Sequence, residues 1–187
     1  MLNRTSYKMA VSGLFFLAAC TLIPNIAYSG KSIPEQTADI VQLSLPISSY
    51  LSTFVINDKE GRNQFYKSFF TNLGVTYALK YSVNDKRPEG HGCCSWPSGH
   101  TSVSFQSATF IYRRYGYKFG VPAYILASFV GWSRVEGEAD MHKPDDVVAG
   151  MIIGSLSSYI FTSKYKSINI VPETKNNYIG VSFEYKL

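Results

Sequence analysis

Three short stretches hold most of the reactive side chains of this chain, and any fold has to bring them together. They are Lys80-x6-Arg87-Pro88, then Pro97-Ser98-Gly99-His100, then Ser133-Arg134 followed by His142-x3-Asp146. The set combines three fixed cations, a glycine-containing turn that ends in a histidine, and a second histidine with a carboxylate one helical turn away. Such side chains can hold a phosphoryl group and transfer it through a histidine.

The first stretch offers two cations to one anion. Lys80 and Arg87 are seven residues apart, which is two helical turns, so both side chains can project from one face of a helix. Pro88 lacks a backbone N–H and biases the preceding residue away from helix, so we expect the helix to end with Arg87 at its tip. The planar guanidinium of Arg87 suits a phosphate, because it can donate two parallel hydrogen bonds.

The second and third stretches each predict the start of a helix. Ser98 is a suitable N-cap, the first N–H groups after it form an anion site, and Gly99 lets the backbone approach a ligand closely. A helix over residues 145–161 would let the Asp146 carboxylate reach one imidazole nitrogen of His142. That contact would fix the tautomer and leave the other nitrogen to attack.

Together the three stretches resemble the signature of the type 2 phosphatidic acid phosphatase superfamily, PAP2. This superfamily includes bacterial class A acid phosphatases and vanadium haloperoxidases. The signature is K-x6-R-P, P-S-G-H and S-R-x5-H-x3-D, and the chain matches the first two blocks at every position. In the third block, seven residues separate Arg134 from His142 where the family usually has five. The resemblance covers residues 60–163.

The resemblance implies a role for each matching residue. His142 would be the nucleophile that forms a phosphohistidine, Asp146 would orient it, and His100 would be the general acid and later the general base. The phosphate-binding groups would be Lys80, Arg87, Arg134 and the backbone N–H groups near Ser98 and Gly99. Because three cations replace a metal ion, we expect no metal site and no cofactor. We expect vanadate to inhibit, since it imitates the transition state.

Three other features receive structural interpretations. His91 matches no block and is interpreted as a loop residue. Cys93 and Cys94 lack the C-x2-C spacing of a zinc site, so they are either small loop residues or a vicinal disulfide. The stretch Gly150-x3-Gly154 resembles a membrane dimerisation motif, and we interpret it as a place of close helix packing inside the fold.

The apolar pattern predicts an all-α fold, which the resemblance specifies as a compact helical bundle of the PAP2 type. We expect helices at residues 40–55, 61–82, 100–115, 120–134 and 145–161. In the tail, residues 166–187 alternate between apolar and polar side chains around Asn176-Asn177, which predicts a short C-terminal β-hairpin. We expect this ribbon to pack on the bundle, because a free hairpin is barely stable, and an apolar contact surface is its alternative role.

The N-terminus has the form of an export signal. Two cations precede an apolar run over residues 9–23, and no acidic residue interrupts them. We expect a signal peptide over residues 1–29 and a single phosphatase domain over residues 30–187. A lipoprotein leader ending before Cys20 and an uncleaved first helix are the alternatives.

These features predict an exported, periplasmic protein that is associated with the membrane surface or anchored through Cys20. With the leader there are six helices, which is the number of spans in integral members of the family. However, the second helix carries Arg62 and Lys67, and the uncharged stretch 147–163 is shorter than the ~20 residues that a bilayer requires. A membrane-spanning protein is therefore disfavoured. The net charge of +5, or +3 without the leader, implies no nucleic-acid partner.

We expect a metal-independent phosphatase that hydrolyses a phosphomonoester or a pyrophosphate. A lipid phosphate is the first choice, because the family often acts on lipids and the 15% aromatic content suits an interface. The alternatives are a broad-specificity soluble acid phosphatase, a vanadium haloperoxidase and a non-enzymatic phosphate- or lipid-binding module. The enlarged loop holds Glu136, Glu138 and Asp140, which either point to solvent or favour substrates with an amine or sugar hydroxyls near the phosphate.

Overall fold

The computed structural model describes residues 33–88, 93–136, 142–175 and 178–186. The leader expected over residues 1–29, with Cys20, and the loop residue His91 lie outside this part of the chain. For the tail from residue 167 onward, the backbone alone is described.

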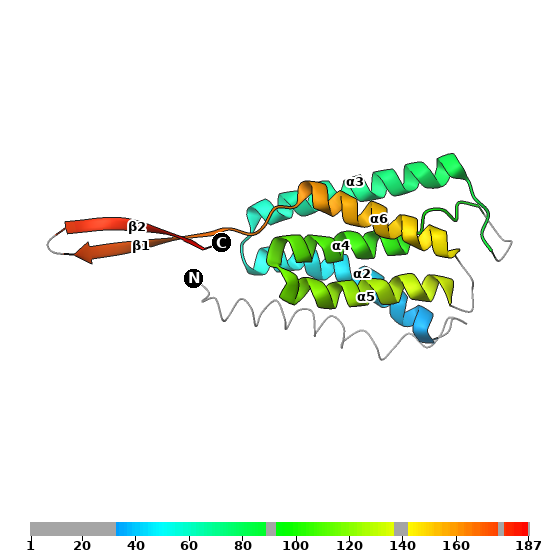
Figure 1. Cartoon of the computed structure of the whole chain (residues 1–187), viewed down its shortest axis with the longest axis horizontal. Coiled ribbons are helices and arrows are strands. Elements are labelled where there is room, and N and C mark those ends of the chain that lie inside the picture. The colour runs from blue at the N-terminus through cyan, green and yellow to red at the C-terminus, as the bar shows by residue number, and fades with distance from the viewer. Residues whose placement is uncertain (1–32, 89–92, 137–141, 176–177, 187) are drawn as a thin grey trace.

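Within these residues five helices form a bundle whose axes run along the long dimension of the molecule (Figure 1). They are α2 (Ile33–Val55), α3 (Lys59–Val83), α4 (Gly99–Tyr115), α5 (Tyr117–Val135) and α6 (Pro144–Phe161). The prediction of an all-helical bundle is confirmed, and each helix overlaps its predicted range. The largest difference is at α2, which begins at Ile33 instead of residue 40 and so includes Glu35 and Asp39.

The helix end predicted at Arg87 is wrong. Helix α3 ends at Val83, because Asn84 takes a left-handed backbone conformation with φ of 50°. The N–H of Asn84 donates to the carbonyl oxygen of Lys80 at 3.1 Å and closes the last turn. Arg87 therefore lies in the loop after the helix, and it does not share a helix face with Lys80.

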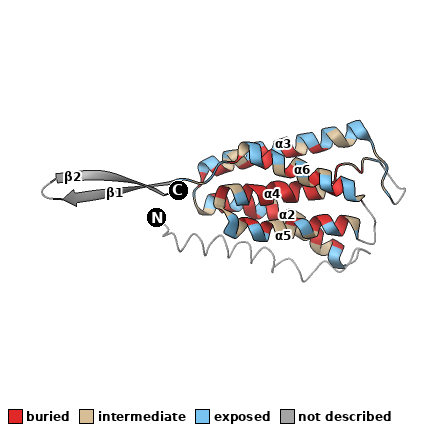
Figure 2. Cartoon of the chain, viewed as in Figure 1, coloured by how far each residue is buried: buried red, intermediate tan, exposed pale blue. Residues whose placement is uncertain are grey.

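Helix α4 lies in the centre of the bundle and is the most buried helix (Figure 2). Helices α2, α3, α5 and α6 all pack against it. The apolar core surrounds its second half and consists of Leu45, Phe65, Phe105, Ala108, Phe110, Ile111, Ala123 and Ala127. Burial of a side chain such as Phe110 contributes roughly 1.5–3 kcal/mol to the stability of the fold, so this cluster holds the other helices against α4.

Helix α6 reaches the backbone of α4 through two glycines. A Cβ atom at Gly150 would lie 2.6 Å from the carbonyl oxygen of Ser98, and one at Gly154 would overlap the carbonyl group of Ser102. Neither position has room for a side chain. The interpretation of Gly150-x3-Gly154 as a place of close packing within the fold is confirmed.

Part of the buried contact between α3 and α4 is polar. The hydroxyls of Thr76 and Ser102 lie 2.9 Å apart, and Ser102 Oγ donates to Asn72 Oδ1 at 3.1 Å. Gln106 Nε2 donates to Ser68 Oγ at 2.9 Å. These bonds satisfy polar groups that would otherwise be costly to remove from water.

The outer surface of the bundle, by contrast, carries many large apolar side chains. Examples from four helices are Leu43, Ile47, Phe70, Ile125, Trp132, Ile152 and Ile160. Apolar surface of this extent is typical of proteins that contact a membrane or a partner. Among the helices of the described chain, none combines the length and the hydropathy that crossing a bilayer requires.

Two strands follow the bundle. Strand β1 (Ser167–Lys175) pairs with β2 (Tyr178–Lys186) in antiparallel register, with Ser167 opposite Lys186. The pair extends away from the helices (Figure 1), so the expected packing of this ribbon on the bundle is not observed. The fold class rests on the helices, and the role of this strand pair stays a prediction.

Candidate active site

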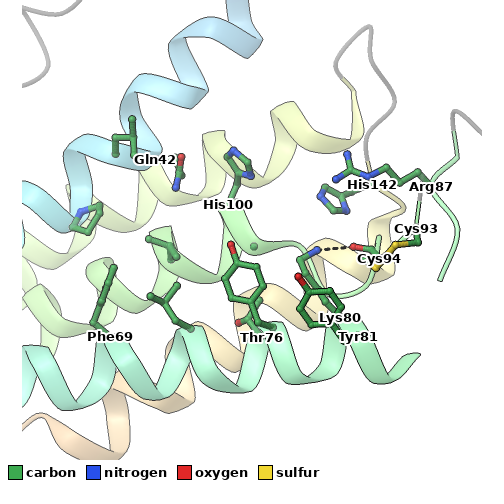
Figure 3. A pocket seen from close by; sticks show the side chains of 16 residues that line it. Gln42, Phe69, Thr76, Lys80, Tyr81, Arg87, Cys93, Cys94, His100 and His142 are labelled. Atoms are coloured by element: carbon green, nitrogen blue, oxygen red, sulfur yellow. Dashed lines mark hydrogen bonds between the residues drawn. A yellow bond between two sulfur atoms is a disulfide. The ribbon is translucent and has the colours of Figure 1, made fainter. Parts of the chain in front are cut away.

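Five of the predicted site residues line one cavity of about 570 Å³ (Figure 3). It opens at the end of the bundle where α3 ends and where α4 and α6 begin. The five residues are Lys80, Arg87, Gly99, His100 and His142. The other three, Ser98, Arg134 and Asp146, are buried and are not among the residues that line the cavity.

Asp146 lies in the first turn of α6 and holds the ring of His142, as the spacing predicted. Its Oδ2 atom lies 3.1 Å from His142 Nδ1, and it also accepts the backbone N–H of Lys143 at 3.0 Å. His142 is only 3% exposed. With Nδ1 turned to the carboxylate, Nε2 is the ring nitrogen that remains for a ligand in the cavity.

Ser95 belongs to the same cluster and was not predicted. This buried side chain donates through Oγ to Asp146 Oδ2, and Oγ lies 3.3 Å from His142 Nδ1. The backbone N–H of Ser95 donates to the carbonyl oxygen of Asp85 at 2.9 Å, which fixes the loop that carries it. A serine between two motifs gives no sequence signal of its own, because its role comes from tertiary contacts.

The site favours the neutral form of His142. Burial lowers the pKa of its imidazole below 6.5, and the nearby cations Lys80 and Arg87 lower it further. The hydrogen bond to Asp146 raises the pKa and is a stronger influence than either cation, but it is weaker than burial. A neutral imidazole has the lone pair that a nucleophile needs.

Lys80 is held beside the ring by the loop before α4. Its Nζ atom donates to the carbonyl oxygens of Cys94 at 2.8 Å and Ser95 at 3.2 Å (Figure 3). Burial, and then the charge of Arg87, lowers the pKa of the Lys80 amine. Cys94 has a left-handed backbone with φ of 69° and forms a disulfide with Cys93. Of the two interpretations of these cysteines, the structure has the vicinal disulfide.

The start of α4 meets the start of α6. Ser98 is the N-cap of α4, and its N–H donates to the carbonyl oxygen of Asp146 at 2.9 Å. The Ser98 hydroxyl accepts a hydrogen bond from Thr101 at 3.0 Å rather than capping a backbone N–H. Because the Ser98 amide is engaged, the next amides of α4 are the candidates for binding an anion. A Cβ atom at Gly99 would meet only Lys80 Cε at 3.6 Å, so the protein's own packing does not require glycine there.

The two residues that flank the longer loop of the third block are joined by a backbone hydrogen bond. The backbone N–H of His142 donates to the carbonyl oxygen of Arg134 at 3.1 Å. Two acidic residues of this loop, Glu138 and Asp140, lie outside the described residues.

The side chain of Arg134 turns to α2, where Nη2 donates to Asp39 Oδ1 at 2.7 Å. Asp39 was not predicted as a site residue, because the sequence placed the start of α2 after it.

At its other end the cavity becomes an apolar groove between α2 and α3 (Figure 3). Its walls there are Leu43, Pro46, Phe69, Leu73, Tyr77 and Val103. One cavity thus joins a cationic end to an apolar end. In the part of the chain that the structure describes, no three His, Cys, Asp or Glu side chains are grouped so that they could hold a metal ion.

Comparison with known proteins agrees with this arrangement. A family model described as the PAP2 superfamily matches residues 60–169. The chain is 31% identical over 175 residues to a lipid A 4'-phosphatase of Helicobacter pylori, covering 84% of this chain and 87% of that protein. It is 38% identical over 163 residues to a lipid A 1-phosphatase of Porphyromonas gingivalis, covering 82% of this chain and 36% of that protein.

A solved structure shares the fold. The crystal structure of Aquifex aeolicus LpxE superposes with a TM-score of 0.55 and 20% sequence identity. The match covers 85% of this chain and 86% of that one.

Proposed function

The chain belongs to the PAP2 superfamily and is a phosphatase, and we propose that it removes a phosphate group from a membrane lipid without using a metal ion. Two relatives are named as lipid A phosphatases, which supports a phosphorylated lipid as substrate. The observation that carries the proposal is the continuity of the cavity, which leads from the imidazole of His142 to the apolar groove between α2 and α3.

The two ends of the cavity suit the two parts of a lipid phosphate. A volume of about 570 Å³ is within the range of binding sites for small molecules. Lys80 and Arg87 would bind the phosphate, while the groove would take the first part of an acyl chain. Each methylene removed from water there contributes roughly 0.8 kcal/mol, so the groove favours a lipid over a soluble ester.

The reaction we propose uses two histidines. Nε2 of neutral His142 attacks phosphorus and forms a phosphohistidine as the bond to the ester oxygen breaks. His100 gives its proton to that oxygen, and it then takes a proton from the water that hydrolyses the phosphohistidine. The Asp146 carboxylate, bound to Nδ1, stabilises the positive charge that develops on the ring of His142.

The phosphate oxygens would be stabilised by fixed positive charge. Lys80 and Arg87 line the cavity directly, and Arg134 acts from the wall behind it. The N-terminus of α4, at Ser98 and Gly99, adds backbone dipoles to these three cations.

We further propose that the protein is exported and works at a membrane surface. The outward-facing apolar side chains of the bundle support contact with lipid. A leader over residues 1–29, a domain over residues 30–187 and a hairpin tail over residues 166–187 belong to this proposal. N-terminal sequencing of the mature protein separates the two leader forms, because cleavage near Ser29 leaves an unmodified start whereas the lipoprotein form begins at an acylated Cys20.

A matched pair of variants on α2 tests the lipid substrate. Leu43 lines the groove and Ile47 does not, although the two side chains are 57% and 56% exposed. Leu43→Asn should raise KM several-fold for a long-chain lipid phosphate and leave the KM of a soluble phosphomonoester unchanged. Ile47→Asn should change neither.

The same assay includes soluble phosphomonoesters, and hydrogen peroxide with bromide, for the alternative activities. Equal efficiency on lipid and soluble esters, with no selective effect of Leu43→Asn, would favour the broad-specificity acid phosphatase. Halide oxidation in the presence of vanadate would instead favour the haloperoxidase.

A further inference from the structure

We propose that Asp39 of α2 is a positioning residue for this site, because one of its carboxylate oxygens lies against both Arg134 and His100. The distance from Asp39 Oδ1 to Arg134 Nη2 is 2.7 Å, and that to His100 Nε2 is 3.7 Å. This inference rests on the proposed phosphatase reaction. It adds a residue from a helix that contributes nothing to the family signature, and α2 lies outside the range that the family model matches.

Asp39 compensates a buried charge. The Arg134 side chain is 1% exposed, and a guanidinium so far from water requires an anionic partner and hydrogen-bond acceptors. The neighbouring turn of α2 helps, since the carbonyl oxygen of Glu35 accepts from Arg134 Nη2 at 3.5 Å. Helix α2 thereby fixes one edge of the guanidinium group, so its positive charge keeps one position behind the cavity wall.

The same oxygen acts on His100 through charge. Asp39 from α2 lies closest to this imidazole among the charged groups whose distance to it is known. Lys80 from α3, with Arg87 and His142 from the loops, lines the same cavity, and Arg134 from α5 binds the same Asp39 oxygen. The three cations oppose the protonated imidazole, whereas the Asp39 carboxylate favours it. Asp39 therefore helps to keep a proton on His100 until the leaving oxygen needs it.

The carboxylate is not itself a proton donor in this scheme. The proton moves from His100 to the oxygen of the leaving group, and the Asp39 carboxylate keeps its hydrogen bond to Arg134. When His100 is neutral, Arg134 is still held. One residue thus serves the orientation of a phosphate ligand and the protonation state of the acid.

Kinetics and an NMR titration of the full-length protein test this role. Asp39→Asn removes the charge and should lower kcat at least tenfold, with KM changed by less than threefold. The alkaline limb of the pH profile of kcat should move down by about one pH unit, the lower end of the range for an opposite charge within 4–6 Å, because the His100 side chain is 41% exposed. The chain has three histidines, so the His100 signal can be assigned, and its titration midpoint should fall by the same amount.

Asp39→Glu keeps the charge and serves as the second variant, including if Asp39→Asn does not fold. It should retain the His100 midpoint and lose kcat through displacement of Arg134. Glu60→Gln removes an exposed carboxylate at the opposite end of the bundle and is the control.

The proposal would be overturned if the titration midpoint of His100 were unchanged in Asp39→Asn. It would also be overturned if the midpoint fell by about one pH unit in Asp39→Glu, which keeps the charge. Loss of stability and activity without that shift would leave Asp39 a structural residue only. The titration does not depend on turnover, so it separates this inference from the proposed function, which fails if the wild-type protein hydrolyses no phosphate ester.

Discussion

The backbone N–H of His142 donates to the carbonyl oxygen of Arg134 at 3.1 Å, so the two ends of the enlarged loop are joined beside the site. The two extra residues of this loop are accommodated between fixed ends. They do not separate the arginine from the histidine. The departure from the family spacing therefore leaves the backbone of Arg134 next to that of His142.

The acidic residues of that loop give one prediction. Changing Glu136, Glu138 and Asp140 to amides should lower KM for a simple dianionic ester, because a carboxylate that faces the site would repel the ester by up to about 1 kcal/mol. The effect should be larger at low ionic strength, and KM for an amine-bearing substrate should rise. Steady-state kinetics at two salt concentrations measure both changes. Identical responses of the two substrates would mean that the loop does not face the site.

The nucleophile gives a second prediction. His142→Ala should abolish phosphatase activity, and Asp146→Asn should reduce kcat by about 10²–10⁴, the range for a group that acts on proton transfer. Asp145→Asn is the matched control, because Asp145 is exposed and lies in the same helical turn. Its kcat should remain within twofold of the wild type. Near-normal activity of His142→Ala would refute the assignment of the nucleophile.

The pH dependence gives a third prediction. The pKa of His142 is lowered from 6.5 by burial, so the attacking imidazole stays neutral into mildly acidic solution. The acid limb of kcat/KM should therefore lie below pH 6.5. In the unfolded chain this histidine recovers its ordinary pKa and binds a proton more readily. Its contribution to stability is thus present above about pH 6.5 and is lost as the pH falls through the folded-state value.

Replacing His142 with glutamine tests that linkage. Acid unfolding of the wild type and His142→Gln, followed by circular dichroism, should show a smaller loss of stability for the variant below pH 6.5. An acid limb of kcat/KM above pH 6.5 would contradict the expected protonation state.

Vanadate and chelators give a fourth prediction. Vanadate adopts the trigonal bipyramidal geometry of the phosphoryl transition state and should inhibit competitively. Thorough treatment with EDTA should leave the rate unchanged, since Lys80, Arg87 and Arg134 carry the positive charge. Recovery of lost activity by a divalent cation after chelation would be evidence for a different mechanism.

The packing of α6 on α4 gives a fifth prediction. Gly154→Ala should lower the free energy of unfolding by about 1–3 kcal/mol, because its Cβ atom would overlap the Ser102 carbonyl. Gly74→Ala is the matched control, since nothing lies within 4 Å of a Cβ atom there. It should stabilise α3 by roughly 0.5–1 kcal/mol. Denaturant unfolding of both variants measures the difference, and equal effects would show that the contact is not tight.

The sequence predicted the helices well where apolar periodicity is strong, and it predicted less where the structure depends on local or tertiary contacts. The start of α2 was missed because Pro34, Glu35 and Gln36 carry no apolar pattern. For the end of α3, the expected range of 61–82 came within one residue of Val83. The second expectation, that Pro88 leaves Arg87 at the helix tip, was wrong because Asn84 ends the helix earlier in a left-handed conformation.

The same limit explains which residues of the site could be predicted from the sequence. His142, His100 and Lys80 could be named because their spacing matches a signature, and their convergence on one cavity follows from the helix ends. Ser95 and Asp39 could not, because each reaches the site only through contacts between distant segments. A charge or hydroxyl outside a motif gives no information about its partner until the helices are placed.

The two glycines of α6, Gly150 and Gly154, also separate the part of the fold that carries the reactive residues from the part that forms the apolar groove. Because these glycines let α6 pack directly on the backbone of α4, the two helices form one block. Its helices begin at Gly99, next to His100, and at Pro144, near His142. The apolar groove is built mainly from α2 and α3, which meet α4 through side chains rather than through bare backbone. Substitutions in the groove can therefore accumulate without disturbing the packing of α6 on α4. Descendants of this fold can therefore exchange one lipid for another while the reaction itself is inherited unchanged.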